Sequence, residues 1–142
     1  MIEYYMKYID WYKEHLLKHK AIVEQIRNKT KDEIIEYFDY DNMKQKHPDF
    51  CPLYASNSKC HDMKKINCYL CGCPYFRFND DGIEIKENRV VYSTCTKGLG
   101  EKSESCNAIH QDCSNCKLPH TKKFISSNFN LDWGLIMKDV IL

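Results

Sequence analysis

The residues best suited to chemistry in this chain are its cysteines, which number nine among 142 residues. Cys68, Cys71 and Cys73 lie within a run of six residues, and Cys113 and Cys116 form a second closely spaced pair. Two residues between two cysteines allow both sulfurs to bind one metal ion. The spacing therefore predicts a metal-binding protein.

The candidate metal ligands are enough for two four-coordinate sites, with two residues to spare. They are eight cysteines and two histidines: Cys51, Cys60, His61, Cys68, Cys71, Cys73, Cys95, Cys113, Cys116 and His120. A working partition gives one site Cys51, Cys60, Cys68 and Cys71, and the other Cys73, Cys95, Cys113 and Cys116. His61 and His120 are alternative ligands or hydrogen-bonding neighbours of a bound metal. Cys106 is expected to be a free thiol in a loop.

Zinc is the first choice of metal because it accepts mixed thiolate and imidazole ligands in closed tetrahedral sites. The run Cys113-x2-Cys116-x3-His120 has this character. An iron–sulfur cluster is the alternative, because the earlier run of three cysteines, followed by Pro74, partly matches a ferredoxin run. Bacterial ferredoxins have two residues where this chain has only Gly72.

Composition and charge argue against several classes of protein. The net charge is +1, from 21 basic and 20 acidic residues, so there is no strong signal for nucleic-acid binding. No stretch approaches the roughly 20 apolar residues that a membrane span requires. Residues 1–10 include Glu3 and lack the apolar run of a secretory signal. We therefore expect a cytoplasmic protein with reduced thiols, in which metal binding is favoured over disulfides.

The region that precedes the cysteines is expected to be helical. Residues 2–28 predict one amphipathic helix, with an apolar seam at Ile2, Tyr5, Ile9, Tyr12, Leu16, His19, Val23 and Ile26. Thr30 and Glu33 predict a capping box that starts a second helix, which ends before residue 48. The two helices would form an antiparallel hairpin that binds a protein partner or a second copy of the chain. His15 and His19 are expected to be solvated or to lie at the edge of the seam.

Short strands and loops are expected around the metal ligands. A hairpin turn is predicted at Asn79–Gly82, because Asn, Asp and Gly accept the positive φ of tight turns. The other predicted elements are strands at 75–78, 83–85 and 89–94, a flexible loop at 96–105, and a helix at 130–142 capped near Asp132.

These patterns together predict an α+β fold in three parts that form one compact unit. A helical hairpin at residues 1–48 packs on a loop-rich, metal-stabilised module at 49–125. This module holds a short β-hairpin or a three-stranded sheet. A C-terminal helical segment at 126–142 closes the chain.

Three sequence blocks, in order, carry a family resemblance. They are Cys60-His61, the run from Asn67 to Tyr75, and Cys113-Ser114-Asn115-Cys116 with Pro119-His120. Over about residues 50–125 the chain resembles the cysteine-rich small domain family. That resemblance implies a zinc-finger-like, metal-binding module, which occurs alone or attached to cobalamin-biosynthesis proteins. The helical hairpin and Cys106 lie outside the pattern.

Three functions remain open at this point. The first is a non-catalytic metal-binding protein whose sites fold the domain and present an interaction surface. The second is an iron–sulfur electron carrier or redox sensor, and the third is an accessory to an enzyme, for which the resemblance suggests corrinoid metabolism. The sequence carries no known catalytic signature that joins a carboxylate to the metal ligands, which argues against an enzyme.

Overall fold

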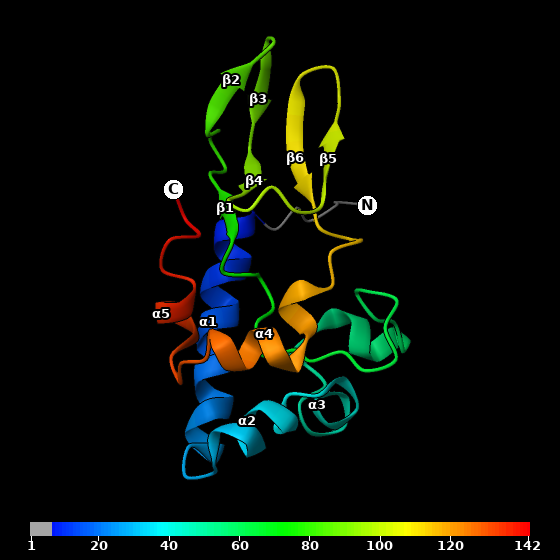
Figure 1. Ribbon diagram of the computed structural model, residues 1–142, viewed down its shortest axis with the longest axis vertical. Helices are drawn as coiled ribbons and strands as arrows, with labels where there is room; N and C mark the ends of the chain where they lie inside the picture. Colours follow the sequence, from blue (N-terminus) through cyan, green and yellow to red (C-terminus); the bar gives the residue numbers. More distant parts are fainter. Residues whose placement is uncertain (1–6) are drawn as a thin grey trace, which may run out of the picture.

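The computed structural model describes residues 7–142 and shows a helical body that carries a projecting arm of β-strands (Figure 1). The helices are α1 (Tyr8–Ile26), α2 (Lys31–Tyr37), α3 (Tyr40–Lys46), α4 (Lys122–Ser127) and α5 (Trp133–Ile136), with 3-10 turns η1 (Pro52–Ser56) and η2 (Leu118–His120). The strands are β1 (Phe76–Phe78), β2 (Glu84–Lys86), β3 (Arg89–Val91), β4 (Ser93–Cys95), β5 (Glu101–Glu104) and β6 (Ala108–Asp112). The predicted mixture of an N-terminal helix, small sheets and a C-terminal helix is confirmed.

Helix α1 is the longest helix and buries one face against the rest of the chain. The buried residues are Tyr12, His15, His19, Ile22, Val23 and Ile26. The predicted amphipathic helix is confirmed from Tyr8 onward, whereas the expected seam residues Ile2 and Tyr5 lie outside the described residues. The buried face contacts α5, where the ring centroids of Tyr12 and Trp133 are 5.0 Å apart. Neither α1 nor another helix within residues 7–142 is long and apolar enough to cross a membrane.

His15 and His19 are 4% and 0% exposed, so the expectation of solvated or seam-edge side chains was wrong. His15 stacks on Trp11, with 4.7 Å between ring centroids, and meets Trp133 edge to face at 4.8 Å. His19 Nε2 donates a hydrogen bond to the Tyr69 carbonyl oxygen at 3.0 Å. Burial lowers the pKa of His15 to about 3 and the pKa of His19 to about 4. Both histidines are therefore neutral members of an aromatic core.

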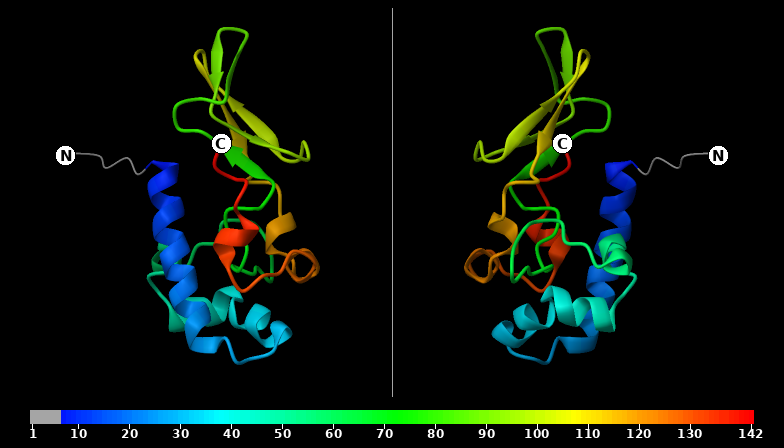
Figure 2. Two further views of the ribbon diagram at one scale, coloured as in Figure 1. Left: turned by 90° about the vertical axis from the view of Figure 1, so that its left-hand side faces the viewer. Right: turned by 90° about the vertical axis from the view of Figure 1, so that its right-hand side faces the viewer.

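The second helical segment is divided into α2 and α3 by a break at Phe38 and Asp39. The Thr30 hydroxyl accepts a hydrogen bond from the Glu33 N–H at 3.2 Å, and the Glu33 carboxylate accepts one from the Thr30 N–H at 3.1 Å. These two bonds confirm the predicted capping box. Helix α2 packs against α4, and it runs across the end of α1 instead of alongside it (Figure 1 and Figure 2).

Strands β1 and β4 form a two-stranded antiparallel sheet in which Phe76 lies opposite Cys95. The predicted hairpin across Asn79–Gly82 is wrong, because this segment joins β1 to β2, which belong to different sheets. Asn79 forms a local turn there, in which its side chain accepts a hydrogen bond from the Asp81 N–H at 2.8 Å. A turn signal of this kind fixes the local bend but not which strands pair.

The second sheet has four strands in the order β2-β3-β6-β5. Strands β3 and β6 are parallel, whereas the two outer pairs are antiparallel hairpins. Strand β5 lies in the region that was expected to be a flexible loop. All four residues of β5 are exposed, so its sequence lacks the alternation that would have identified a strand.

The core is built around the segment that carries the central cysteines. Tyr69 and Leu70 are both 0% exposed, and Phe38 and Trp133 pack with them in the same buried cluster. A C-terminal helix is confirmed at α5, where the Asp132 carboxylate accepts a hydrogen bond from the Gly134 N–H at 2.9 Å, but α5 is much shorter than the predicted 130–142. The predicted ligand run therefore passes through the core.

The buried histidines predict a loss of stability in acid. Their folded pKa values lie below the ordinary value of 6.5, so each contributes stability that is present above about pH 6.5 and is lost as pH falls towards 4. Each should cost about 1.4 kcal/mol of unfolding free energy at pH 5.5. The unfolding free energy, measured with denaturant at pH 7.5 and at pH 5.5, should fall less between these two pH values for His15→Phe than for the parent chain. His110→Gln, at an exposed histidine, should leave that difference unchanged.

Candidate metal centre

The adjacent residues Cys60 and His61 meet a distant third residue, His120, at a single point. The Cys60 Sγ lies 3.1 Å from His61 Nδ1 and 3.6 Å from His120 Nε2. One ligand atom from each of the three residues lies within 4.8 Å of those of the other two. A tetrahedral zinc ion with Zn–S and Zn–N bonds of about 2.3 and 2.0–2.1 Å separates its ligand atoms by roughly 3.3–3.8 Å. The Cys60–His120 distance falls in this range and the Cys60–His61 distance is slightly shorter, so the three atoms lie close enough together to share one ion.

The far nitrogen of each ring is held by a backbone carbonyl. His61 Nε2 lies 2.9 Å from the Cys113 carbonyl oxygen, and His120 Nδ1 lies 2.8 Å from that of Asn67. A carbonyl oxygen can only accept a hydrogen bond, so these two nitrogens carry the protons. His61 Nδ1 and His120 Nε2 consequently present lone pairs towards Cys60. Metal-binding histidines are typically oriented in this way.

The protonation state of His120 also suits a ligand. His120 is buried, and this burial is the largest influence that lowers its pKa. The hydrogen bond to the Asn67 carbonyl opposes the effect, and the neighbouring His61 adds to it. His120 is therefore neutral near pH 7, as a metal ligand must be. Cys60, in contrast, is exposed, so the group can be reached from solvent.

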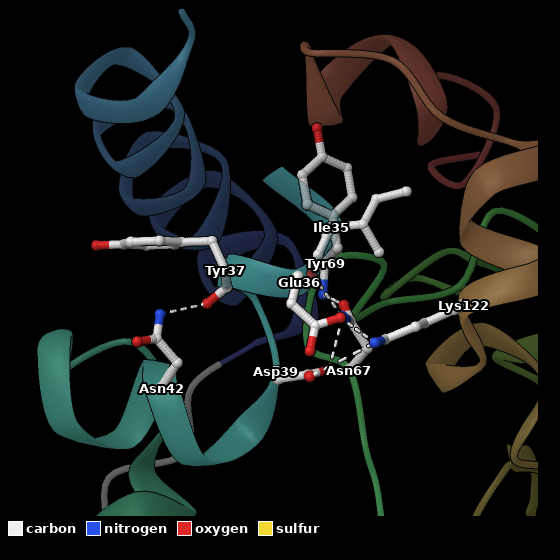
Figure 3. A network of polar contacts seen from close by, with 8 residues as sticks. All are labelled: Ile35, Glu36, Tyr37, Asp39, Asn42, Asn67, Tyr69 and Lys122. Atoms are coloured by element: carbon white, nitrogen blue, oxygen red, sulfur yellow. Dashed lines mark hydrogen bonds and ion pairs between the residues drawn. The ribbon is translucent and has the colours of Figure 1, made fainter. Parts of the chain in front are cut away.

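Asn67 connects this group to the helices, and Figure 3 shows Asn67 beside Ile35, Asp39 and Tyr69. Its side-chain amide donates to the Ile35 carbonyl oxygen at 2.7 Å and to the Asp39 carboxylate at 3.1 Å, and its side-chain oxygen accepts from the Tyr69 N–H at 2.9 Å. Its backbone N–H donates to the His120 carbonyl oxygen at 3.2 Å. Asn67 is 1% exposed and thus fixes the position of His120 relative to α2. The sequence offered no signal for this role beyond the position next to Cys68.

A second group of thiols surrounds Cys68, which is buried. A hydrogen bond from Cys71 is the largest influence on Cys68 and lowers its pKa, while the pKa of Cys71 is raised well above the ordinary value. Burial raises the pKa of Cys51, and the charge of nearby Cys68 raises it further. Cys60 is exposed as a residue, but its sulfur is partly buried, and this partial burial raises its pKa to about 11, with further contributions from the charges of Cys68 and Cys51. Cys60 therefore lies near both the histidines and this group of thiols.

A third group of thiols lines a cavity of about 230 Å³. These thiols are Cys73, Cys95, Cys113 and Cys116, and both His61 and His120 also line the cavity. Burial raises the pKa of Cys73 to about 11, and the charges of Cys113, Cys95 and Cys116 add to the effect. Cys113 and Cys116 are drawn together by a hydrogen bond from the Cys116 N–H to the Cys113 carbonyl oxygen at 3.0 Å.

A sharp bend separates Cys71 from Cys73. Gly72 has φ +102° and Cys73 has φ +51°, both in the region that favours glycine. A Cβ on Gly72 would lie 3.2 Å from the Trp133 ring and 3.4 Å from the Trp11 ring. The bend places Cys71 with the Cys68 group and Cys73 at the cavity, which explains why only one residue stands between these two cysteines.

The other cysteines are less closely grouped. Within residues 7–142, no second set of three Cys, His, Asp or Glu ligand atoms lies as close together as those of Cys60, His61 and His120. Cys106 is an exposed free thiol in the turn between β5 and β6, at the outer end of the strand arm (Figure 1). The described cysteines form no disulfide.

Comparison of the chain with family models, curated proteins and solved structures finds no match. The resemblance to the cysteine-rich small domain family therefore stays a prediction.

The bend at Gly72 gives a test of how the two thiol groups are separated. Gly72→Ala adds a Cβ against two tryptophan rings, so we expect a loss of about 2–4 kcal/mol of unfolding free energy from strain and overpacking. Gly98→Ala is the matched control, because Gly98 also has positive φ (+66°) but no atom within 4 Å of the added Cβ. The unfolding free energies of both variants are measured with denaturant. Equal losses of unfolding free energy for Gly72→Ala and Gly98→Ala would contradict this explanation.

Asn67 gives a test of how His120 is positioned. Asn67→Ala removes two buried and one partly buried side-chain hydrogen bond, and we expect it to lower the unfolding free energy by about 3 kcal/mol and metal affinity by about 10–100-fold. Asn42→Ala is the control, because Asn42 makes one partly buried bond, to the Tyr37 carbonyl oxygen at 2.6 Å. Competitive metal titration with a chelator should show no change of affinity for the control. Equal affinities of the two variants would show that Asn67 does not act on the metal.

Proposed function

We propose that this chain is a non-catalytic metal-binding protein, in which zinc ions bound by cysteine and histidine hold the loop-rich part together. The observation that carries the proposal is the convergence of Cys60 Sγ, His61 Nδ1 and His120 Nε2, with both outer ring nitrogens donating to carbonyl oxygens. One sulfur and two nitrogens are a donor set that zinc accepts readily. Reduced thiols of this kind require a reducing compartment such as the cytoplasm.

The second site in this proposal is formed by Cys73, Cys95, Cys113 and Cys116, which share one cavity. An iron–sulfur cluster is the alternative occupant here. It is favoured by one observation: no three of these sulfurs lie within 4.8 Å of one another, a wider spacing than a single ion requires. Cys51, Cys68 and Cys71 supply further thiols close to Cys60, and an all-cysteine site of these four is the alternative to the Cys60–His61–His120 site.

A structural role follows from the position of the ligands in the chain. An ion at the first site would join the loop that contains Cys60 and His61 to η2, which ends at His120. Structural zinc provides about 10–16 kcal/mol of apparent binding free energy, whereas whole domains are stable by only about 5–15 kcal/mol. Loss of the metal would therefore unfold this part of the chain.

The proposed interactions with other molecules have less support. The apolar face of α1 is buried against the chain itself, so it does not form the partner surface that the helical hairpin was expected to offer. Accessory action in corrinoid metabolism has only the family resemblance behind it. We therefore restrict the proposal to metal binding and metal-dependent folding.

The proposal is tested by measuring the metal content and absorption spectrum of protein purified without oxygen. We expect about two zinc ions per chain and no visible absorbance, because zinc has a filled d shell. His61→Gln should lose one ion per chain and unfold at lower denaturant concentration, whereas His110→Gln should retain both. A chain without bound metal, unaffected by chelators, would contradict the proposal. Iron with acid-labile sulfide would establish the cluster instead.

A further inference from the structure

Strand β2 forms an edge of the four-stranded sheet, because the strand order is β2-β3-β6-β5 and β2 pairs with β3 on one side. The β2–β3 hairpin lies at the outer end of the strand arm, away from the helices (Figure 1). All three residues of β2 are exposed. Edge strands present backbone N–H and C=O groups with which another strand can pair. This edge is therefore accessible to a second chain.

The hydrogen bonds of β3 show which backbone groups of β2 point outward. Val90, which lies opposite Ile85, donates its N–H to the Asn107 carbonyl oxygen at 3.1 Å, on the side of β6. In an antiparallel pair, two opposite residues either exchange hydrogen bonds with each other or both point away from the pair. The Ile85 N–H and C=O therefore point to the open edge, where they can exchange two hydrogen bonds with a partner strand.

The Ile85 side chain also favours a partner strand. It is 76% exposed, the largest value among the exposed large apolar side chains of residues 7–142. Ile85 lies opposite Val90, and Val90 lies opposite Ala108, so the three side chains share one face of the sheet. A partner strand with an apolar residue opposite Ile85 would lengthen this row and remove apolar surface from water.

The charges on the two sides of Ile85 are self-complementary. Glu84 precedes Ile85 and Lys86 follows it, and neither forms an ion pair within residues 7–142. If two copies of β2 pair antiparallel with Ile85 opposite Ile85, Glu84 of each copy lies opposite Lys86 of the other. Opposite charges across two strands are favourable, whereas like charges there are destabilising. A second copy of β2 thus fits this edge in both backbone and side chains.

The opposite edge of the sheet, β5, is less suited to pairing. Its residues are Glu-Lys-Ser-Glu, so it carries no apolar side chain. Lys102 Nζ already donates to the Thr94 hydroxyl at 2.9 Å and to the Gln111 side-chain oxygen at 2.7 Å, and Glu104 pairs with Arg89 at 3.6 Å. A strand added at β5 would compete with these contacts.

We infer that β2 is a self-association edge, at which the β2 strands of two copies pair antiparallel about a two-fold axis at Ile85. A contact of this kind uses the same surface on both copies and is complete in the dimer. Three residues from each strand bury much less than the roughly 1,000 Å² of a stable interface, so the dimer is weak and forms at high protein concentration. The inference goes beyond the proposed function and does not depend on which metal is bound.

The test is analytical ultracentrifugation of the whole chain, purified without oxygen, from micromolar to millimolar concentration. The dimer fraction of the parent chain should rise across this range. Glu84→Lys and Lys86→Glu each put like charges opposite each other in a homodimer, so each variant alone should dimerise about tenfold more weakly. An equimolar mixture of the two variants should dimerise as the parent chain does, because each supplies the charges that the other lacks. The double variant should also dimerise as the parent chain does.

Two further variants test the apolar contact and its location. Ile85→Lys should weaken dimerisation about tenfold, because it removes the apolar contact and places like charges at the two-fold axis. Leu135→Lys, at a position 55% exposed on α5, is the matched control and should leave dimerisation unchanged. Lys138→Glu, at another exposed position, controls in the same way for the charge change of Lys86→Glu. Because all the substituted side chains are exposed, the variants should unfold at the same denaturant concentration as the parent chain.

Several outcomes would overturn the inference. A parent chain that stays monomeric at millimolar concentration would do so. A dimer of the parent chain would not use β2 if the mixture of Glu84→Lys and Lys86→Glu dimerised no better than either variant alone, or if Leu135→Lys weakened the dimer as much as Ile85→Lys. The proposed metal binding would stand in each of these cases, since metal content is measured separately.

Discussion

The candidate metal centre depends on two hydrogen bonds from histidine to backbone carbonyl oxygen. They assign the proton of His61 to Nε2 and that of His120 to Nδ1, so the remaining nitrogens face Cys60 as lone-pair donors. Because the acceptors are backbone atoms of Cys113 and Asn67, the ring orientations follow from the path of the chain. Correct folding of the segments around residues 67 and 113 is thus what prepares the site.

That path is fixed by polar contacts as much as by apolar packing. Asn67 joins α2, the central cysteine segment and η2 through buried hydrogen bonds, which a fully satisfied side chain can make without a large desolvation cost. Gly72 then turns the chain against two tryptophan rings, where an added Cβ would be crowded and the φ of +102° disfavours any side chain. The ligand groups are therefore set on a rigid aromatic core, although they come from loops.

Local signals were predicted well, and long-range pairing was not. The capping box at Thr30, the cap at Asp132 and the amphipathic α1 are encoded within a few residues, and all three were found. The pairing of β1 with β4, the parallel contact of β3 with β6 and the role of Asn67 depend on distant segments. Spacing identified Cys60, His61 and His120 as candidates, but only the fold shows that they meet. The assignment of the remaining cysteines to sites stays a prediction.

A comparison of His15 and His19 with His61 and His120 shows why residue type and spacing are insufficient to identify metal ligands. His15 and His19 are one helical turn apart, as a chelating pair would be, yet each is enclosed by aromatic rings and no cysteine or carboxylate completes a metal group with them in residues 7–142. His61 and His120 are far apart in sequence but share a sulfur. His19 also donates its Nε2 proton to a carbonyl oxygen, so that feature alone does not define a ligand. What distinguishes the histidines of the candidate metal centre is a second nitrogen that faces a thiol instead of the aromatic core.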